Sequence, residues 1–140
     1  MGAERFVLGF ADFWRNPSPE RMGELLSEDV VLRQPLSPPM RGLVAAQVEF
    51  EKIFRWLPDL RGVVDGWSAA GETVFIEFRL RATLSGRPLE WPVVDRFTLR
   101  GDKASERVSY FDGLPLLVRV LRQPTSWWGW WRSGAARPWS

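Results

Sequence analysis

The strongest structural constraint in this sequence is a long alternation of apolar and polar residues between Thr73 and Arg100. In TVFIEFRLRATL (73–84) every second side chain from Val74 to Leu84 is apolar, and most of the others are charged. After a turn at SGRP, the run LEWPVVDRFTLR alternates in the same way. A period of two is typical of β-strands with one buried and one solvated face. The pattern predicts two antiparallel strands joined by a short turn.

Segments on both sides complete a mixed architecture. Apolar residues at helical spacing predict three helices: 3–15, a short one that begins after Ser18 and carries Met22, Leu25 and Leu26, and 43–57. Further strands are expected at 30–35, 60–70 and 104–112, and SPPMRG (37–42) is expected to be a loop. Helices followed by a long antiparallel sheet indicate an α+β domain, assigned to residues 1–122, with a tail over 123–140.

Composition narrows the chemistry. The chain has 140 residues, 45% of them hydrophobic and 26% charged, as expected for one globular domain. It contains no cysteine and no histidine, which excludes Ser-His-Asp and Cys-His catalysis and Cys/His zinc sites. Proton transfer is left to Asp, Glu, Lys and the single Tyr110. No leader and no apolar run of membrane-spanning length is seen, so we expect a cytoplasmic protein that needs neither metal nor cofactor.

Charge is unevenly distributed. Four arginines and no acidic residue follow Asp112, whereas the first 112 residues carry 15 basic and 17 acidic side chains. A nearly neutral body argues against a nucleic-acid interface over the domain.

Asp95 is the residue that most suggests a site. Its parity places it with Trp91, Val93, Phe97 and Leu99 on the face expected to be buried. A carboxylate there must be paired, solvated in a cavity or kept neutral by a raised pKa. One interpretation is a structural acid bonded to a buried arginine or to backbone amides; the other is a catalytic acid.

Asp112 is the second candidate. It ends the last predicted strand in SYFDGLPLL. Strict alternation groups it with Val108 and Tyr110, but a β-bulge would turn Phe111 inward instead, so its facing stays open. Asp before Gly-Leu-Pro is also an ordinary capping residue.

With these residues the chain resembles the nuclear transport factor 2-like superfamily, within it the SnoaL-like polyketide cyclases and steroid isomerases. The resemblance rests on the element order and on VVDRFTLRGDKASERVSYFD with a leucine-rich helix after it, over roughly residues 4–122. It implies a cone-shaped curved antiparallel sheet wrapped around the N-terminal helices and a deep apolar pocket. It also implies a homodimer through the outer sheet face, where Glu77, Arg79 and Arg81 would meet the partner.

The resemblance also assigns roles to single positions. Steroid isomerases carry a tyrosine on the first helix, a base aspartate on the first strand and a second aspartate kept protonated on a later strand. The corresponding residues here are Phe10, Gln34 and Asp95, so two of the three differ. SnoaL-like cyclases use an aspartate before the terminal helix, which corresponds to Asp112, together with a histidine that this chain lacks.

A related group, similar to limonene epoxide hydrolase, uses an Asp-Arg-Asp network in which Arg and Asp lie two apart on one strand face. Here Val93 holds the position two before Asp95, and Arg96 points to the other face.

Three functions follow. The first is a cofactor-free cyclase, isomerase or hydrolase acting on a small hydrophobic carbonyl or epoxide compound, with Asp112 as base and Asp95 as proton donor. The second is a non-catalytic protein that binds a hydrophobic small molecule. The third is a dimeric scaffold. The residues expected to line the pocket are Phe10, Trp14, Gln34, Trp56, Trp91, Phe97, Tyr110 and Phe111.

The tail TSWWGWWRSGAARPWS (125–140) contains five of the nine tryptophans. Packing onto the body or onto a dimer interface is the favoured prediction, because it buries the indoles. Tryptophan mixed with arginine is also typical of segments that lie on a membrane surface, which stays as the alternative.

Overall fold

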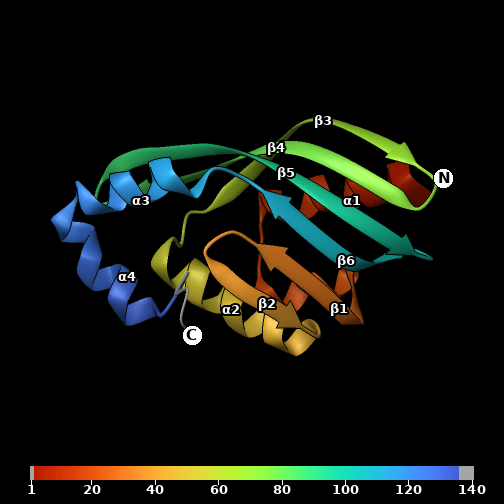
Figure 1. Ribbon diagram of the computed structural model, residues 1–140, viewed down its shortest axis with the longest axis horizontal. Helices are drawn as coiled ribbons and strands as arrows, with labels where there is room; N and C mark the ends of the chain where they lie inside the picture. The colour runs from red at the N-terminus through yellow and green to blue at the C-terminus, as the bar shows by residue number, and fades with distance from the viewer. Residues whose placement is uncertain (1, 136–140) are drawn as a thin grey trace.

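The computed structural model of the protein describes residues 2–135, in which a curved six-stranded sheet has the strand order β2-β1-β6-β5-β4-β3 (Figure 1). Neighbouring strands are antiparallel except β1 and β6, which are parallel. The elements are α1 (Gly2–Arg15), the 3-10 helix η1 (Pro19–Glu24), β1 (Leu26–Gln34), β2 (Ser37–Arg41), α2 (Leu43–Trp56), β3 (Arg61–Ala70), β4 (Thr73–Leu84), β5 (Arg87–Arg100), β6 (Lys103–Tyr110), α3 (Gly113–Leu121), the 3-10 helix η2 (Pro124–Ser126) and α4 (Trp127–Ser133). The predicted α+β architecture with helices preceding a curved sheet is confirmed.

Helix α1 lies against the inner face of the sheet through its aromatic residues. The ring of Phe10 meets Phe78 of β4 edge-to-face at 4.9 Å and Phe97 of β5 at 5.5 Å. Phe6 contacts Phe97 at 4.8 Å in the same geometry. All these side chains are buried. Edge-to-face packing of this kind adds to the burial of apolar area, so the centre of the core is predominantly aromatic.

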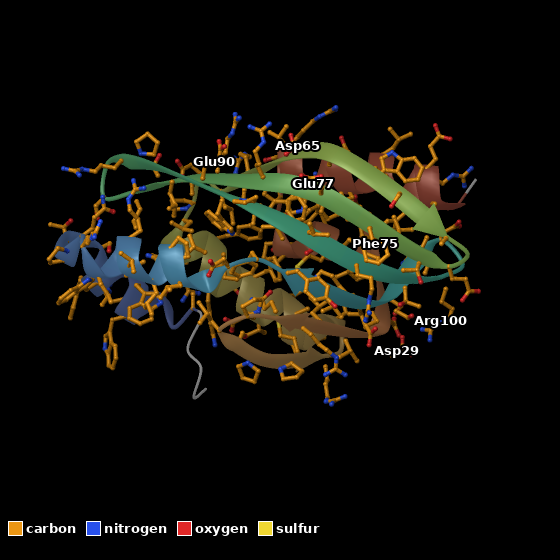
Figure 2. The ribbon with its side chains drawn as sticks, turned by 45° about the horizontal axis from the view of Figure 1, so that its top comes forward. Asp29, Asp65, Phe75, Glu77, Glu90 and Arg100 are labelled. Atoms are coloured by element: carbon orange, nitrogen blue, oxygen red, sulfur yellow. The ribbon has the colours of Figure 1, made fainter. Side chains whose placement is uncertain are left out.

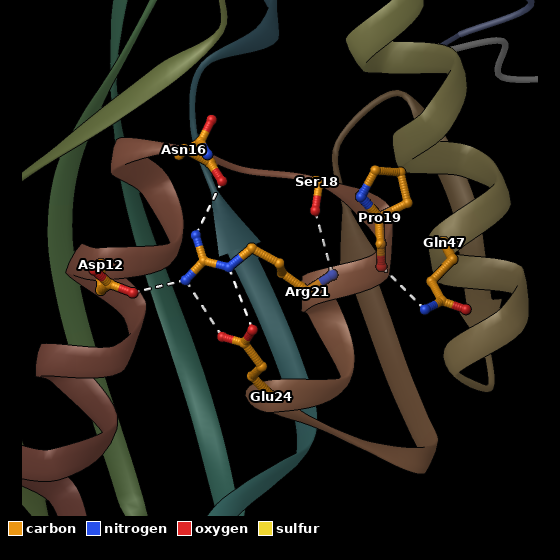
Figure 3. A network of polar contacts seen from close by, with 7 residues as sticks. All are labelled: Asp12, Asn16, Ser18, Pro19, Arg21, Glu24 and Gln47. Carbon is orange, nitrogen blue, oxygen red and sulfur yellow. Dashed lines mark hydrogen bonds and ion pairs between the residues drawn. The ribbon is translucent and has the colours of Figure 1, made fainter.

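The short helix η1 is held between α1 and α2 by polar contacts (Figure 3). The Arg21 guanidinium donates to Asp12 Oδ2 of α1 at 2.6 Å and to the Asn16 carbonyl at 3.0 Å. Gln47 of α2 donates to the Pro19 carbonyl at 3.0 Å. Ser18 is the N-cap, as predicted, and accepts from the Arg21 amide. These contacts fix η1, whose Met22 faces the core.

Two predicted elements are corrected by the structure. The expected loop 37–42 is largely strand β2, in which Met40 pairs with Leu32 of β1. Its two prolines are tolerated because β2 is an edge strand, where backbone N–H groups are not needed by a further neighbour. The second helix does not extend through Leu26, because the Leu25 carbonyl accepts from the Ala104 amide at 2.8 Å and the chain enters β1 beside β6.

The outer face of the sheet is charged. Arg79 pairs with Asp65 at 2.9 Å and Arg81 with Glu90 at 2.7 Å. Figure 2 shows the acidic partners along the same region as Glu77 and Phe75, and Phe75 is 40% exposed. These ion pairs form within one chain, and whether this face meets a second copy stays a prediction.

At one end of this surface two strands from distant parts of the sequence are linked. The guanidinium of Arg100, at the end of β5, donates a hydrogen bond to the Asp29 carboxylate of β1, and Figure 2 shows the two side chains adjacent. This hydrogen bond lowers the pKa of Asp29 to about 2.

The C-terminal helices form one end of the molecule, opposite the N-terminus (Figure 1). Asp112 caps α3 by accepting from the Leu114 amide at 3.0 Å. Helix α4 lies against α2, and Trp130 packs against the core. None of the helices in the part of the chain that the structure describes is long and apolar enough to cross a bilayer. The last predicted tail residues, 136–140, lie outside the described residues.

Candidate active site

A cavity of about 420 Å³ lies between the inner face of the sheet, α2 and the C-terminal helices. This volume is in the range of sites for small organic ligands. Its walls are mostly apolar, with four polar or charged side chains among them: Gln34, Asp95, Arg107 and Ser109. The remaining lining residues are Trp14, Pro35, Leu36, Phe50, Ile53, Trp56, Leu57, Leu60, Phe78, Leu80, Leu89, Trp91, Val93, Phe111, Leu116, Leu117, Val120 and Trp130.

A β-bulge decides which residues of β6 face this cavity. At the turn Arg100 pairs with Lys103, but farther along Thr98 pairs with Glu106, which leaves Ser105 as the extra residue. The inserted residue reverses the facing of everything that follows it. Arg107 and Ser109 therefore turn inward, and the cavity is also lined by the next residue of that parity, Phe111.

Asp95 lies on β5 at the inner face and is 1% exposed. Ser109 is directly opposite on β6, and its hydroxyl donates a hydrogen bond to the carboxylate. Burial raises the pKa of Asp95, against the opposing effects of the Arg107 charge and the Ser109 hydrogen bond. The folded environment therefore favours the protonated acid more than water does.

Arg107 lies on the same face as Asp95, two residues along β6 from Ser109. Its Nη2 donates to Gln34 Oε1 of β1 at 2.6 Å, and its guanidinium lies over the Phe50 ring at 5.5 Å from the centroid. Burial lowers the pKa of Arg107, and the charge of Asp95 opposes this shift. Because an arginine pKa starts far above neutrality, the side chain stays charged.

Two buried side-chain donors lack a hydrogen-bond acceptor among residues 2–135: Nε of Arg107 and Nε1 of Trp91. Both residues line the cavity. A buried N–H without an acceptor costs about 1–3 kcal/mol. An acceptor that reaches either N–H from the cavity side would remove this cost.

A second space of about 30 Å³ lies on the α1 side of the same residues. Asp95 and Arg107 line it together with Phe10, Phe97 and other apolar side chains of α1, η1 and β1. Its volume suits one water molecule. Asp95 and Arg107 thus line both spaces, as do Trp14 and Phe50.

The structure brings most of the predicted site residues together. Those that line the large cavity are Asp95, Trp14, Gln34, Trp56, Trp91 and Phe111. Phe10 and Phe97 line only the smaller space. Tyr110 is 51% exposed, outside both linings, because the bulge turns it outward. Asp112 is exposed and caps α3, so it is not brought to Asp95.

Sequence reasoning missed Arg107, Ser109 and the cavity-lining residues of α3. Arg107 would have been found if the last strand had been paired with β5 in the bulged register. In the unbulged register set by the turn, Asp95 faces Val108 and Arg107 points to solvent. Among the described residues, no group of three or more Asp and Glu side chains is placed to hold a metal ion.

Comparisons with known proteins agree with this fold. The model of the SnoaL-like domain family matches residues 7–107. No match is found among curated proteins. Among solved structures, IdmH, a proposed polyketide cyclase from Streptomyces antibioticus, is 18% identical with a TM-score of 0.75, over 86% of this chain and 99% of IdmH.

Two further structures show the same fold. TerC, co-crystallised with polyporic acid, is 17% identical with a TM-score of 0.76, over 84% of this chain and 97% of TerC. A nuclear transport factor 2-like protein of unknown function from Burkholderia pseudomallei K96243 is 16% identical with a TM-score of 0.74, over 84% and 96% of the two chains. The fold is thus that of the nuclear transport factor 2-like proteins.

Proposed function

Since this chain belongs to the SnoaL-like domain family, we propose that it is a cofactor-free enzyme that exchanges protons with a small hydrophobic carbonyl compound. The observation that carries the proposal is a fully buried carboxylic acid, Asp95, in the wall of a mainly apolar cavity. A buried acid with a raised pKa in such a cavity is typical of acid–base catalysts. The likeness to IdmH favours cyclisation as the reaction.

The cavity offers hydrogen-bond donors to the ligand. The N–H groups of Arg107 Nε and Trp91 Nε1 have no acceptor among residues 2–135, and each would donate to an oxygen of the ligand. The apolar walls suit fused or linked rings. This combination favours a flat hydrophobic molecule with carbonyl oxygens over an aliphatic hydrocarbon.

Asp95 supplies the proton chemistry. As a carboxylate it takes a proton from the carbon next to the carbonyl group, and the C–H electron pair moves to form an enolate. The Arg107 and Trp91 donors stabilise the enolate oxygen. The enolate carbon then attacks a second carbonyl of the same molecule, and Asp95 returns its proton to the new alkoxide. A raised pKa strengthens the carboxylate as a base, which this first step requires.

The test uses 2-tetralone, an apolar bicyclic ketone whose C1 protons exchange with D₂O through the enolate. We expect the protein to accelerate this exchange, followed by ¹H NMR, and Asp95→Asn to lower the acceleration by about 10²–10⁴-fold. Asp112→Asn is the matched control. We expect it to retain exchange, because the amide oxygen can still cap α3.

Other outcomes decide against parts of the proposal. Exchange retained in Asp95→Asn would show that Asp95 is not the base, and loss confined to Asp112→Asn would assign that role to Asp112. Binding of polyporic acid, measured by absorbance titration, without any acceleration of exchange would indicate a binding protein instead of an enzyme.

A further inference from the structure

Helix α3 is apolar on nearly all sides, although only one side faces the protein. Leu116, Leu117 and Val120 line the cavity. A second, solvent-exposed stripe at the helical spacing i, i+3, i+4, i+7 consists of Leu114, Leu117, Val118 and Leu121, with Leu117 at the border of the two sides. A helix that is apolar all round is normally covered on all sides, so the exposed stripe indicates a contact surface.

Helix α4 extends this surface with tryptophans. Trp130 packs inward, whereas Trp127, Trp128 and Trp131 are exposed, Trp128 by 68% and Trp131 by 57%. The Trp127 ring is held in place, because its Nε1 donates to the Val120 carbonyl at 2.7 Å. We call the exposed stripe of α3 together with these three indoles the α3–α4 face. An apolar hollow of about 540 Å³ lies between the two helices on this face.

The charged side chains that follow Asp112 in the sequence are all arginines. Arg122 and Arg132 are exposed at its edge, and Arg132 lies over the Trp128 ring at 6.0 Å from the centroid. Arg119 donates to the Pro88 carbonyl at 2.6 Å, which joins α3 to the start of β5. No acidic residue follows Asp112 in the sequence. Among residues 2–135, Arg122 and Arg132 form no ion pair, so the face combines exposed indoles and aliphatic side chains with positive charge.

From these features we propose that the α3–α4 face docks on an anionic lipid surface. Indoles lie at the headgroup level of membranes, and arginines meet anionic headgroups there. A second copy of the chain fits less well, because a symmetric contact through this face would bring its arginines against one another without an acidic partner. The proposal does not depend on the proposed enzymatic function.

The cavity lies close to the α3–α4 face, so docking there would affect how a ligand enters the protein. Leu117, Val120 and Trp130 line both the hollow on the α3–α4 face and the large cavity. A docked lipid surface would thus lie one layer of side chains from the cavity. An apolar compound dissolved in the membrane would have a short path into the protein between α3 and α4.

The experiment is co-sedimentation of the full chain with vesicles of phosphatidylcholine containing 30% phosphatidylglycerol, compared with pure phosphatidylcholine. We expect binding to the anionic vesicles that weakens with added salt. Trp128→Ser/Trp131→Ser should weaken it at least tenfold, and Arg122→Gln/Arg132→Gln should remove the preference for anionic lipid. Trp67→Ser is the matched control, since Trp67 is 46% exposed on β3, away from this face, and should bind like the wild type.

Circular dichroism and thermal melting establish that each variant is folded, and the single Trp128→Ser replaces the double variant if that one does not fold. Failure of the wild type to bind either vesicle overturns the proposal, as does binding that the tryptophan substitutions leave unchanged. A dimer seen by light scattering that the tryptophan variants dissociate, with no vesicle binding, would assign the face to a second copy.

Discussion

The guanidinium of Arg107 donates a 2.6 Å hydrogen bond to Oε1 of Gln34, joining β6 to β1 beside the cavity. In the resemblance to the steroid isomerases, Gln34 corresponds to the residue expected to be their base. In this chain that position orients a buried cation instead of taking a proton. The pattern of the limonene epoxide hydrolase-like proteins places an arginine and an aspartate on the same strand. In this chain the arginine beside Asp95 is Arg107, which lies on the neighbouring strand β6. Among residues 2–135, Asp95 is the only acid in the cavity lining.

Asp95→Asn is expected to become more stable, relative to the wild type, as the pH rises. Above the ordinary pKa of 3.8 the unfolded chain ionises Asp95, while the folded protein holds its proton to higher pH. Ionisation therefore favours unfolding, and the wild type loses stability between 3.8 and the raised pKa. The asparagine variant has no such loss. Melting temperatures of both proteins at pH 4, 6 and 8 measure the difference, at about 3–4 °C per kcal/mol.

No further control variant is needed, because the wild type and Asp95→Asn share every other titrating group. A melting-temperature difference that stays constant, or that turns against the variant at high pH, would show that Arg107 keeps the carboxylate ionised in the folded state.

Trp91→Phe is expected to weaken ligand binding while leaving the fold intact. The substitution removes a buried N–H that has no acceptor among residues 2–135, which stabilises the fold, and it also removes buried ring area, which destabilises it. The two effects oppose each other, so the free energy of unfolding should change by less than about 1 kcal/mol. If the cavity holds an aromatic ketone as proposed, loss of one donor should weaken its binding, measured with 2-tetralone, about 3–10-fold. Trp56→Phe, which changes another indole of the cavity wall, is the control. Equal effects of the two substitutions would contradict a specific role for the Trp91 donor.

Gly62→Ala is expected to destabilise the fold by about 1–3 kcal/mol. A Cβ at this position on β3 would lie 2.9 Å from Cβ and Cγ of Trp14, whose ring is buried between α1 and the sheet. Gly66→Ala on the same strand is the matched control, since a Cβ there meets nothing within 4 Å. Urea denaturation gives both free energies. A Gly62→Ala protein as stable as Gly66→Ala would mean that α1 can move away from β3.

The predicted homodimer through the outer sheet face is tested by Phe75→Glu/Tyr110→Glu. Both side chains are exposed on that face. If two copies meet there, the substitutions would place unpaired carboxylates in the interface, which is costly, so the dimer should dissociate. Light scattering would then show a monomer. Asp29→Glu, at the Arg100 contact on the rim of this surface, should leave the dimer intact. A wild-type monomer at micromolar concentration would rule the dimer out.

The local sequence pattern was sufficient to predict the helices and strands whose apolar residues recur with a regular period. The bounds of β4 are those that the alternation of 73–84 predicts, and the same alternation places Asp95 on the inner face. The spacing of aromatic residues in 3–15 likewise predicted α1. These elements are specified by residues close in sequence, because each apolar side chain has to reach the same buried face.

Tertiary structure decided the features that depend on a partner strand or helix. The extra residue at Ser105 brings Arg107 and Ser109 to Asp95 and turns Tyr110 outward, yet nothing in the local alternation marks it. Strand β2 exists because an edge position beside β1 tolerates its prolines. In the tail, composition predicts that indoles seek a contact, but only packing against α2 and the core determines that Trp130 turns inward while Trp128 stays exposed. The sequence by itself thus determined the periodic elements and the inward acid, and pairing between distant segments determined which groups surround that acid.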